Sequence, residues 1–120
     1  MEWQTKVKTE SLQDRFTYAT RFLFAGSCFA TEVAERMRQL HFMVAPDAFG
    51  PLFNPASIVS SLERLESRTP FVPADVMHFP YGAFGSLSHH TSFSRGDEAG
   101  FLTYANEQLK IASDCFEKAE

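Results

Sequence analysis

The stretch from Phe22 to Ala45 constrains the fold most, because two short apolar runs flank an amphipathic segment in it. The runs are Phe22-Leu23-Phe24-Ala25 and Phe42-Met43-Val44-Ala45. Continuous apolar runs of this length are typical of strands that are buried on both faces of a parallel sheet. Two such strands joined by a helix form a βαβ unit, so the sequence predicts an α/β fold.

The segment between the two runs has helical periodicity. Its large apolar residues recur at spacings of three and four and predict one buried face, made of Phe29, Val33, Met37 and Leu40. Glu32 and Arg36 form a favourable pair one helical turn apart. We therefore expect a helix from about residue 29, with Ser27 or Cys28 at its cap.

Two more helices are predicted further along the chain. Asn54 is a typical N-cap, Pro55 suits the first helical position, and the helix should end near Arg68. Its expected buried residues are Ile58, Val59, Leu62 and Leu65. The last helix should run from about Asp97 to the C-terminus and bury Phe101, Ala105, Leu109, Ala112 and Phe116. Residues 70–96 are rich in Pro and Gly, which predicts a long loop with one short strand near residues 86–89.

The turn Gly26-Ser27-Cys28 places two nucleophilic side chains between the first strand and its helix. A helix N-terminus has unpaired N–H groups and a positive dipole end, which favour the ionised form of a thiol and can hold an oxyanion. Cysteine is the better intrinsic nucleophile near neutral pH, so Cys28 is favoured slightly over Ser27. The alternative is structural, since small residues let a strand and a helix approach closely.

Three motifs occur in the same order as in a known family: Gly26 to Ala30, Phe49 to Ile58, and His89-His90-Thr91-Ser92-Phe93-Ser94. On these motifs the chain resembles the GSCFA-domain family, whose members are distantly similar to SGNH/GDSL-type hydrolases. The resemblance implies that residues 1–120 are the N-terminal part of one domain with a three-layer parallel sheet of the SGNH or flavodoxin type. Family members continue into further strands with an Asp-x-x-His element, so we expect a truncated domain that is inactive by itself.

The resemblance also implies a site. Ser27 or Cys28 would be the nucleophile, and His89 would contact substrate. The general base would come from a later segment of the domain or, as the less favoured alternative, from His90. Gly26, Gly50 and Asn54 would line the oxyanion pocket. Where family members usually have Asn-Pro before the Phe-Gly pair, this chain has Asp47-Ala48.

Several of these residues also have a simpler, structural interpretation. Asn54 is explained equally well as a helix cap, and His89 or His90 as an ordinary loop residue. Asp75-Val76-Met77-His78 imitates the terminal Asp-x-x-His of SGNH hydrolases, but it follows the turn too soon and is interpreted as a coincidence.

The implied activity is that of an esterase or acyltransferase acting on O-acyl esters, such as O-acetyl groups of carbohydrates. The alternative is a non-catalytic module that binds a carbohydrate or an acyl group. We expect no cofactor, and no metal site, because the His and Cys residues lack a third ligand at a convincing spacing.

Composition limits the partners. A net charge of −4 argues against nucleic-acid binding, and no apolar run approaches the roughly 20 residues that span a bilayer. Two cysteines and no visible signal peptide favour a reduced, cytoplasmic setting. The 13 Phe are many for 120 residues, so self-association through an exposed aromatic surface is expected.

Overall fold

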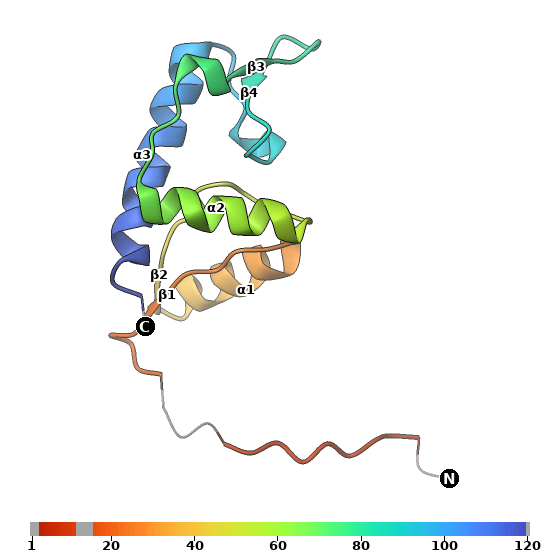
Figure 1. Cartoon of the computed structure of the whole chain (residues 1–120). Coiled ribbons are helices and arrows are strands. Elements are labelled where there is room, and N and C mark those ends of the chain that lie inside the picture. Colours follow the sequence, from red (N-terminus) through yellow and green to blue (C-terminus); the bar gives the residue numbers. More distant parts are fainter. Residues whose placement is uncertain (1–2, 12–15, 120) are drawn as a thin grey trace.

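A computed structural model describes residues 3–11 and 16–119 (Figure 1). Within these residues the chain forms three α-helices and two small two-stranded sheets, one of them parallel. The fold is therefore mixed α/β, as predicted at that level. A three-layer parallel sheet is not formed within the described residues.

The predicted βαβ unit is confirmed. Strand β1 (Arg21–Phe22) pairs in parallel with β2 (Met43–Val44), and helix α1 (Cys28–Gln39) connects them. Arg21 lies opposite Met43, and Phe22 lies opposite Val44. Both strands have two residues, and β1 begins one residue before its apolar run. Beyond them the pairing extends to a 2.8 Å hydrogen bond from Ala45 N–H to the Phe22 carbonyl.

The buried face of α1 differs from the prediction. Ala34 is its only buried residue among those described, whereas Phe29 is 75% exposed and Leu40 is 50% exposed. A two-stranded sheet covers only a narrow stripe of a helix, so the large apolar side chains at the helix ends have nothing to pack against within the described residues.

Helix α2 (Pro55–Ser67) has the predicted boundaries. The Asn54 side chain caps its N-terminus, and Arg68 ends it in a left-handed conformation. Leu65 is buried as predicted, but Val59 is 55% exposed and Ser61 takes a buried place instead.

Helix α3 (Glu98–Phe116) begins at the Asp97 cap and supplies much of the core. Figure 1 shows it running across the C-terminal end of α2. Its predicted stripe is buried except for the partly exposed Phe116. The core combines residues of α2 and α3 with the loops before them, namely Ala48, Phe49, Leu65, Phe71, Phe93, Phe101, Ala105, Leu109 and Ala112.

Residues 70–96 contain more structure than predicted. Strands β3 (Met77–His78) and β4 (Phe84–Gly85) pair antiparallel, and two short 3-10 turns cover Pro73–Asp75 and Thr91–Phe93. The strand expected near residues 86–89 is absent from this described segment. The Ser86 hydroxyl holds a turn there, because it bonds the Ser88 N–H at 3.1 Å and His89 Nδ1 at 2.6 Å.

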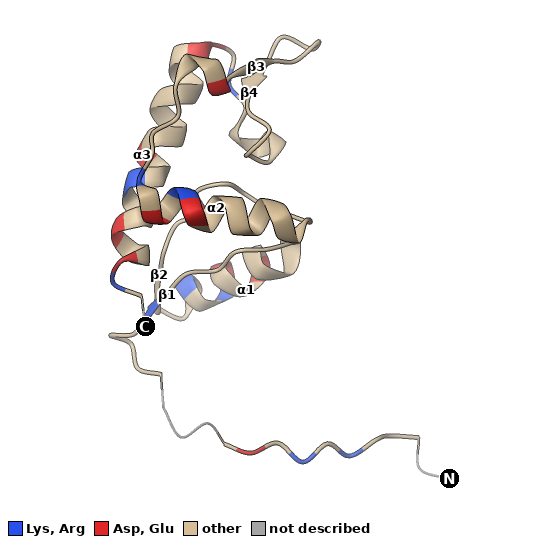
Figure 2. Ribbon diagram, viewed as in Figure 1, with Lys and Arg blue, Asp and Glu red and all other residues tan. Residues whose placement is uncertain are grey.

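Charged side chains are unevenly spread over the fold (Figure 2). Residues 48–62 and 76–94 contain no Lys, Arg, Asp or Glu, so the start of α2 and the loops facing it are uncharged. Among the described residues, no helix is both long enough and apolar enough to cross a membrane.

Candidate functional site

The turn after β1 presents both predicted nucleophiles. Gly26 has a φ of +148°, a conformation that side chains disfavour, and Ser27 is the N-cap of α1. The Ser27 side chain does not cap the helix, and Cys28, the first helical residue, is exposed. Within the described residues neither side chain makes a hydrogen bond, and the first N–H groups of α1 stay unpaired.

The loop between β2 and α2 lies against this turn. The N–H of Leu52 donates to the carbonyl of Gly26 at 2.7 Å. The turn follows β1 and the loop follows β2, and the carboxyl ends of parallel strands meet at one edge of a sheet, which makes the two segments neighbours. The bond therefore brings the start of α2 to the start of α1, at the same end of the fold (Figure 1).

Asp47 organises the loop, a role that the motifs did not predict. Its Oδ1 accepts from the N–H of Phe49 at 3.2 Å and from that of Gly50 at 2.8 Å. An Asp two or three residues before a Gly is a recognisable pattern for such a turn. One consequence corrects an expectation: the Gly50 N–H is already bonded, so it is not a free donor for an oxyanion.

Gly50 is instead required for close packing against His90. Its φ is +78°, and a Cβ placed on it would lie 2.6 Å from the Cβ of His90. The His90 N–H donates to the Phe49 carbonyl at 2.7 Å. The loop therefore contacts the Gly26 turn on one side and His90 on the other, and links the three motifs.

His90 caps the short turn Thr91–Phe93. Its Nδ1 accepts from the Ser92 N–H at 3.2 Å and lies 3.0 Å from the Ser92 hydroxyl. An Nδ1 that accepts from an N–H carries no proton, so in the neutral ring Nε2 carries it. In this arrangement His90 offers a donor at Nε2, whereas a base acting through Nε2 would need the other tautomer.

Asn54 fits both of the roles considered for it. Its Oδ1 accepts from the Ala56 N–H at 2.8 Å, as a helix cap does. The Nδ2 group has no partner within the described part of the chain, and the residue is exposed. Capping orients the amide and leaves its donor free, so the cap does not exclude oxyanion binding.

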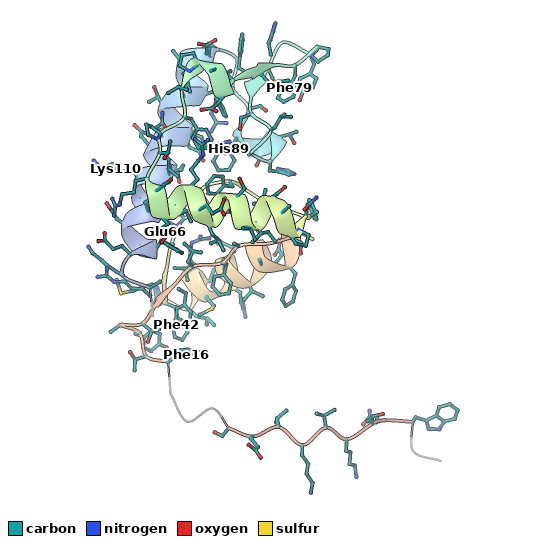
Figure 3. All side chains as sticks on the ribbon, viewed as in Figure 1. Phe16, Phe42, Glu66, Phe79, His89 and Lys110 are labelled. Atoms are coloured by element: carbon teal, nitrogen blue, oxygen red, sulfur yellow. The ribbon has the colours of Figure 1, made fainter. Side chains whose placement is uncertain are left out.

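His89 belongs to the core and not to this surface, which corrects its expected contact with substrate. Its ring packs against those of Phe49, Phe71, Phe93 and Phe101 beside α3 (Figure 3). Burial, with a smaller effect of the Arg64 charge, lowers the pKa of His89 from 6.5 to about 4, and the nearby Ala48 backbone opposes the shift. The ring is therefore neutral at neutral pH.

The Asp75–His78 pair does not form a catalytic dyad. The Asp75 carboxylate accepts from the Val72 N–H at 2.9 Å and lies 3.8 Å from Arg64 Nη1. His78 stacks on Phe84 in the hairpin, on the exposed side of β3. Their interpretation as a coincidence agrees with these separate contacts.

A model of the GSCFA family matches residues 21–120 of the chain. The chain belongs to the GSCFA family. No curated protein and no solved structure matches it. The similarity of this GSCFA chain to SGNH/GDSL hydrolases stays a prediction. Across residues 3–11 and 16–119, no three His, Cys, Asp or Glu side chains are grouped so that they could hold a metal ion.

Proposed function

We propose that this GSCFA chain carries the nucleophile and the oxyanion-binding groups of an SGNH-like esterase or acyltransferase for O-acyl esters, such as O-acetyl groups of carbohydrates. The observation that carries the proposal is the 2.7 Å bond between Leu52 and Gly26, which joins the unpaired N-terminus of α1 to the loop before Asn54. The β1–α1–β2 unit would then be the first part of a three-layer sheet.

Cys28 is the proposed nucleophile, because its thiol is exposed and thiolates attack carbonyl carbon readily. Its sulfur would bond to the acyl carbon, and the carbonyl oxygen would become an oxyanion held by α1 N–H groups and Asn54 Nδ2. Collapse of this intermediate would break the ester C–O bond and leave a thioester. The departing alcohol oxygen would take up, through solvent, the proton that the Cys28 thiol gives up on attack. Water or an acceptor alcohol would then take the acyl group and return its proton to the thiol. Ser27 is the alternative nucleophile.

His90 would supply a hydrogen bond from Nε2 to the ester or to the leaving oxygen. A base role would require His90 to give up its bond from Ser92. His90→Gln retains an N–H donor without a titrating ring, whereas His90→Ala retains neither. If His90→Gln keeps part of the esterase activity and His90→Ala keeps none, His90 acts as a hydrogen-bond donor and not as a base.

Acylation by p-nitrophenyl acetate tests the nucleophile directly. Since p-nitrophenolate leaves without taking a proton, this reaction needs only a nucleophile and oxyanion donors. We expect mass spectrometry to find one acetyl group on the peptide with Cys28, absent in Cys28→Ala and retained in Cys115→Ala. Acetylation confined to lysines or Cys115, or equal Cys28 labelling in unfolded protein, would reject covalent catalysis at this turn.

Asn54→Asp tests the oxyanion group with little change in the fold. Aspartate keeps the Oδ1 that caps α2 but lacks the Nδ2 donors. Loss of an oxyanion donor costs about 10²–10³ in rate, so acylation should slow by that order while the unfolding midpoint stays near that of the parent. An unchanged rate would assign Asn54 to capping alone.

The second candidate function is non-catalytic binding of a carbohydrate or acyl group. A cavity of about 260 Å³ beside α2, lined by several serine hydroxyls, favours it. Sugar binding without any adduct at Ser27 or Cys28 would support this function.

A further inference from the structure

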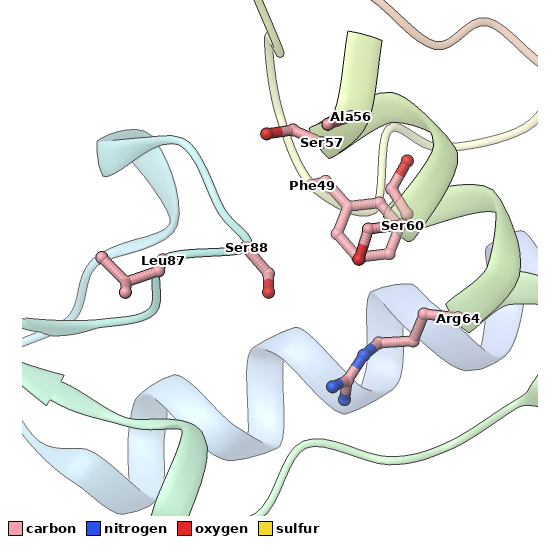
Figure 4. Close-up of a pocket in the computed structure, with 8 residues that line it drawn as sticks. Phe49, Ala56, Ser57, Ser60, Arg64, Leu87 and Ser88 are labelled. Atoms are coloured by element: carbon pink, nitrogen blue, oxygen red, sulfur yellow. The ribbon is translucent and has the colours of Figure 1, made fainter. Parts of the chain in front are cut away.

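A cavity of about 260 Å³ lies between α2 and the loop that carries Leu87 and Ser88 (Figure 4). One wall is the face of α2 from Ala56 to Arg64, and Phe49 forms part of the lining. Typical pockets for drug-sized ligands hold about 300–1,000 Å³, so this cavity suits a smaller ligand, such as one sugar ring.

Arg64 is held firmly but keeps free donors. Its Nη1 lies 3.3 Å and 3.4 Å from the carbonyls of Thr69 and Pro70, and its guanidinium stacks on Phe71 at 4.1 Å. Nε and Nη2 have no partner among the described residues. A guanidinium fixed by one nitrogen can present its other two to a carboxylate with little loss of side-chain entropy.

Three of the four serine hydroxyl groups in the lining are unused, and Ser61 is the exception. Ser61 Oγ donates to the Ile58 carbonyl at 2.7 Å. The hydroxyls of Ser57, Ser60 and Ser88 have no protein partner within the described segments. Ser88 faces the cavity from the wall opposite α2 (Figure 4). Hydroxyls on two walls can each donate and accept, which suits a ligand with several hydroxyl groups.

The charge of the cavity favours an anion. Arg64 is its only charged lining residue among those described. The nearest carboxylate, that of Asp75, lies 3.8 Å from Nη1 and already accepts from Val72. The charge in the described lining is therefore positive, and the ion pair with Asp75 just outside it offsets this charge in part.

We propose that this cavity binds a hydroxylated carboxylate of the sugar-acid class, with the carboxylate on Arg64 and hydroxyls on Ser57, Ser60 and Ser88. Phe49 belongs to the loop between β2 and α2, and the same loop reaches the Gly26 turn through the bond from Leu52. The ligand would therefore be bound by the element that also contacts this turn. The inference rests on the proposed function for the statement that this ligand is part of the substrate, but binding itself needs no turnover.

Binding is measured by NMR titration of the protein with sodium D-glucuronate, and with D-glucose as the matched neutral sugar. We expect shifts at Arg64 Nε–H and at the amides of Ser60 and Ser88. A charged hydrogen bond exceeds a neutral one enough that glucuronate should bind at least about tenfold more tightly than glucose. Equal affinities, or no shifts at these residues, would overturn the proposal.

Variants test whether glucuronate binds in this cavity or elsewhere on the protein. Arg64→Gln should weaken glucuronate binding about tenfold, whereas Arg68→Gln, which removes the same charge just beyond the end of α2, should not. Ser60→Leu fills the cavity from an exposed helix position, so it should abolish binding without unfolding the chain. Undiminished binding in both Arg64→Gln and Ser60→Leu would reject the site.

The acyl-transfer proposal and the cavity proposal can be rejected independently of each other. Ser27→Ala and Cys28→Ala should retain glucuronate binding even though one of them loses the acetyl adduct. Binding without an adduct in the parent protein would reject the acyl-transfer mechanism and leave the cavity proposal standing. An adduct without glucuronate binding would reject the cavity proposal alone.

Discussion

A Cβ atom added to Gly50 would lie 2.6 Å from the Cβ of His90. The contact joins the motif before α2 to the motif that contains the paired histidines. It involves an atom next to the backbone, so rotation of the His90 side chain cannot relieve it. Close packing at this point therefore explains why a glycine is needed where the loop meets His90.

Gly50→Ala should destabilise the fold by two effects, the positive φ and the clash with His90. Gly82 is the matched control, because its φ of +79° equals that of Gly50 within a degree and no atom lies within 4 Å of an added Cβ. We expect Gly82→Ala to cost about 1–2 kcal/mol and Gly50→Ala at least about 1 kcal/mol more, measured by urea unfolding. Equal costs would show that His90 moves away freely.

Stability should fall at acidic pH through His89. Its pKa in the fold is about 4, below the 6.5 of an exposed histidine, so the unfolded chain binds the proton more tightly. The contribution is fully present above about pH 6.5 and is lost as the pH falls toward about 4. The full loss is on the order of 3 kcal/mol.

Two measurements check this dependence. The NMR titration of the His89 ring should have its midpoint near 4, and a midpoint near 6.5 would contradict the buried, neutral state. His89→Phe has no titrating group at this position, so its free energy of unfolding should fall less steeply over the same pH range. Comparing slopes keeps the test valid even if the variant is less stable overall.

Local signals in the sequence predicted the helices well. Asn54 with Pro55 fixed the start of α2, and the stripe from Phe101 to Ala112 identified the buried face of α3. The wrong predictions concern burial, because burial depends on which other elements pack against a helix. The sequence of α1 cannot show that only two strands of the described part of the chain pair beside it, and so Phe29 was wrongly expected to be buried.

The candidate site was predicted in outline but not in its hydrogen bonds. The strand order placed the Gly26 turn beside the loop before Asn54 correctly, because parallel strands end at the same edge. Which groups remain free depends on tertiary contacts. Asp47 accepts a hydrogen bond from the Gly50 N–H, and the His89 ring packs in the core against the rings of Phe49 and Phe71. Neither could be inferred from motif spacing.

Self-association is expected at the exposed aromatic face over β1 and β2. Phe16 is 61% exposed and contacts Phe22, and Tyr18 is 65% exposed and stacks on Phe42. Burying such rings gains about 25 cal/mol per Å² of apolar area. Sedimentation velocity should show reversible association that Phe16→Ser and Tyr18→Ser weaken. Phe53→Ser, which removes an exposed ring at the N-terminal end of α2, is the control; an equal loss there would mean that association is nonspecific.

Asp47 should stabilise the loop through geometry and not through charge. Its Oδ1 accepts two N–H bonds, and an Asn side chain offers the same oxygen in the same place. Asp47→Asn should therefore change the free energy of unfolding by less than about 0.5 kcal/mol, whereas Asp47→Ala should cost about 1–2 kcal/mol and expose the Gly50 amide to hydrogen exchange. Because the same loop reaches Gly26 through Leu52, acetylation of Cys28 should slow in the Ala variant only. If Asp47→Asn and Asp47→Ala lower the free energy of unfolding equally, the negative charge of Asp47 stabilises the loop. The two hydrogen bonds to Oδ1 would then not explain its effect.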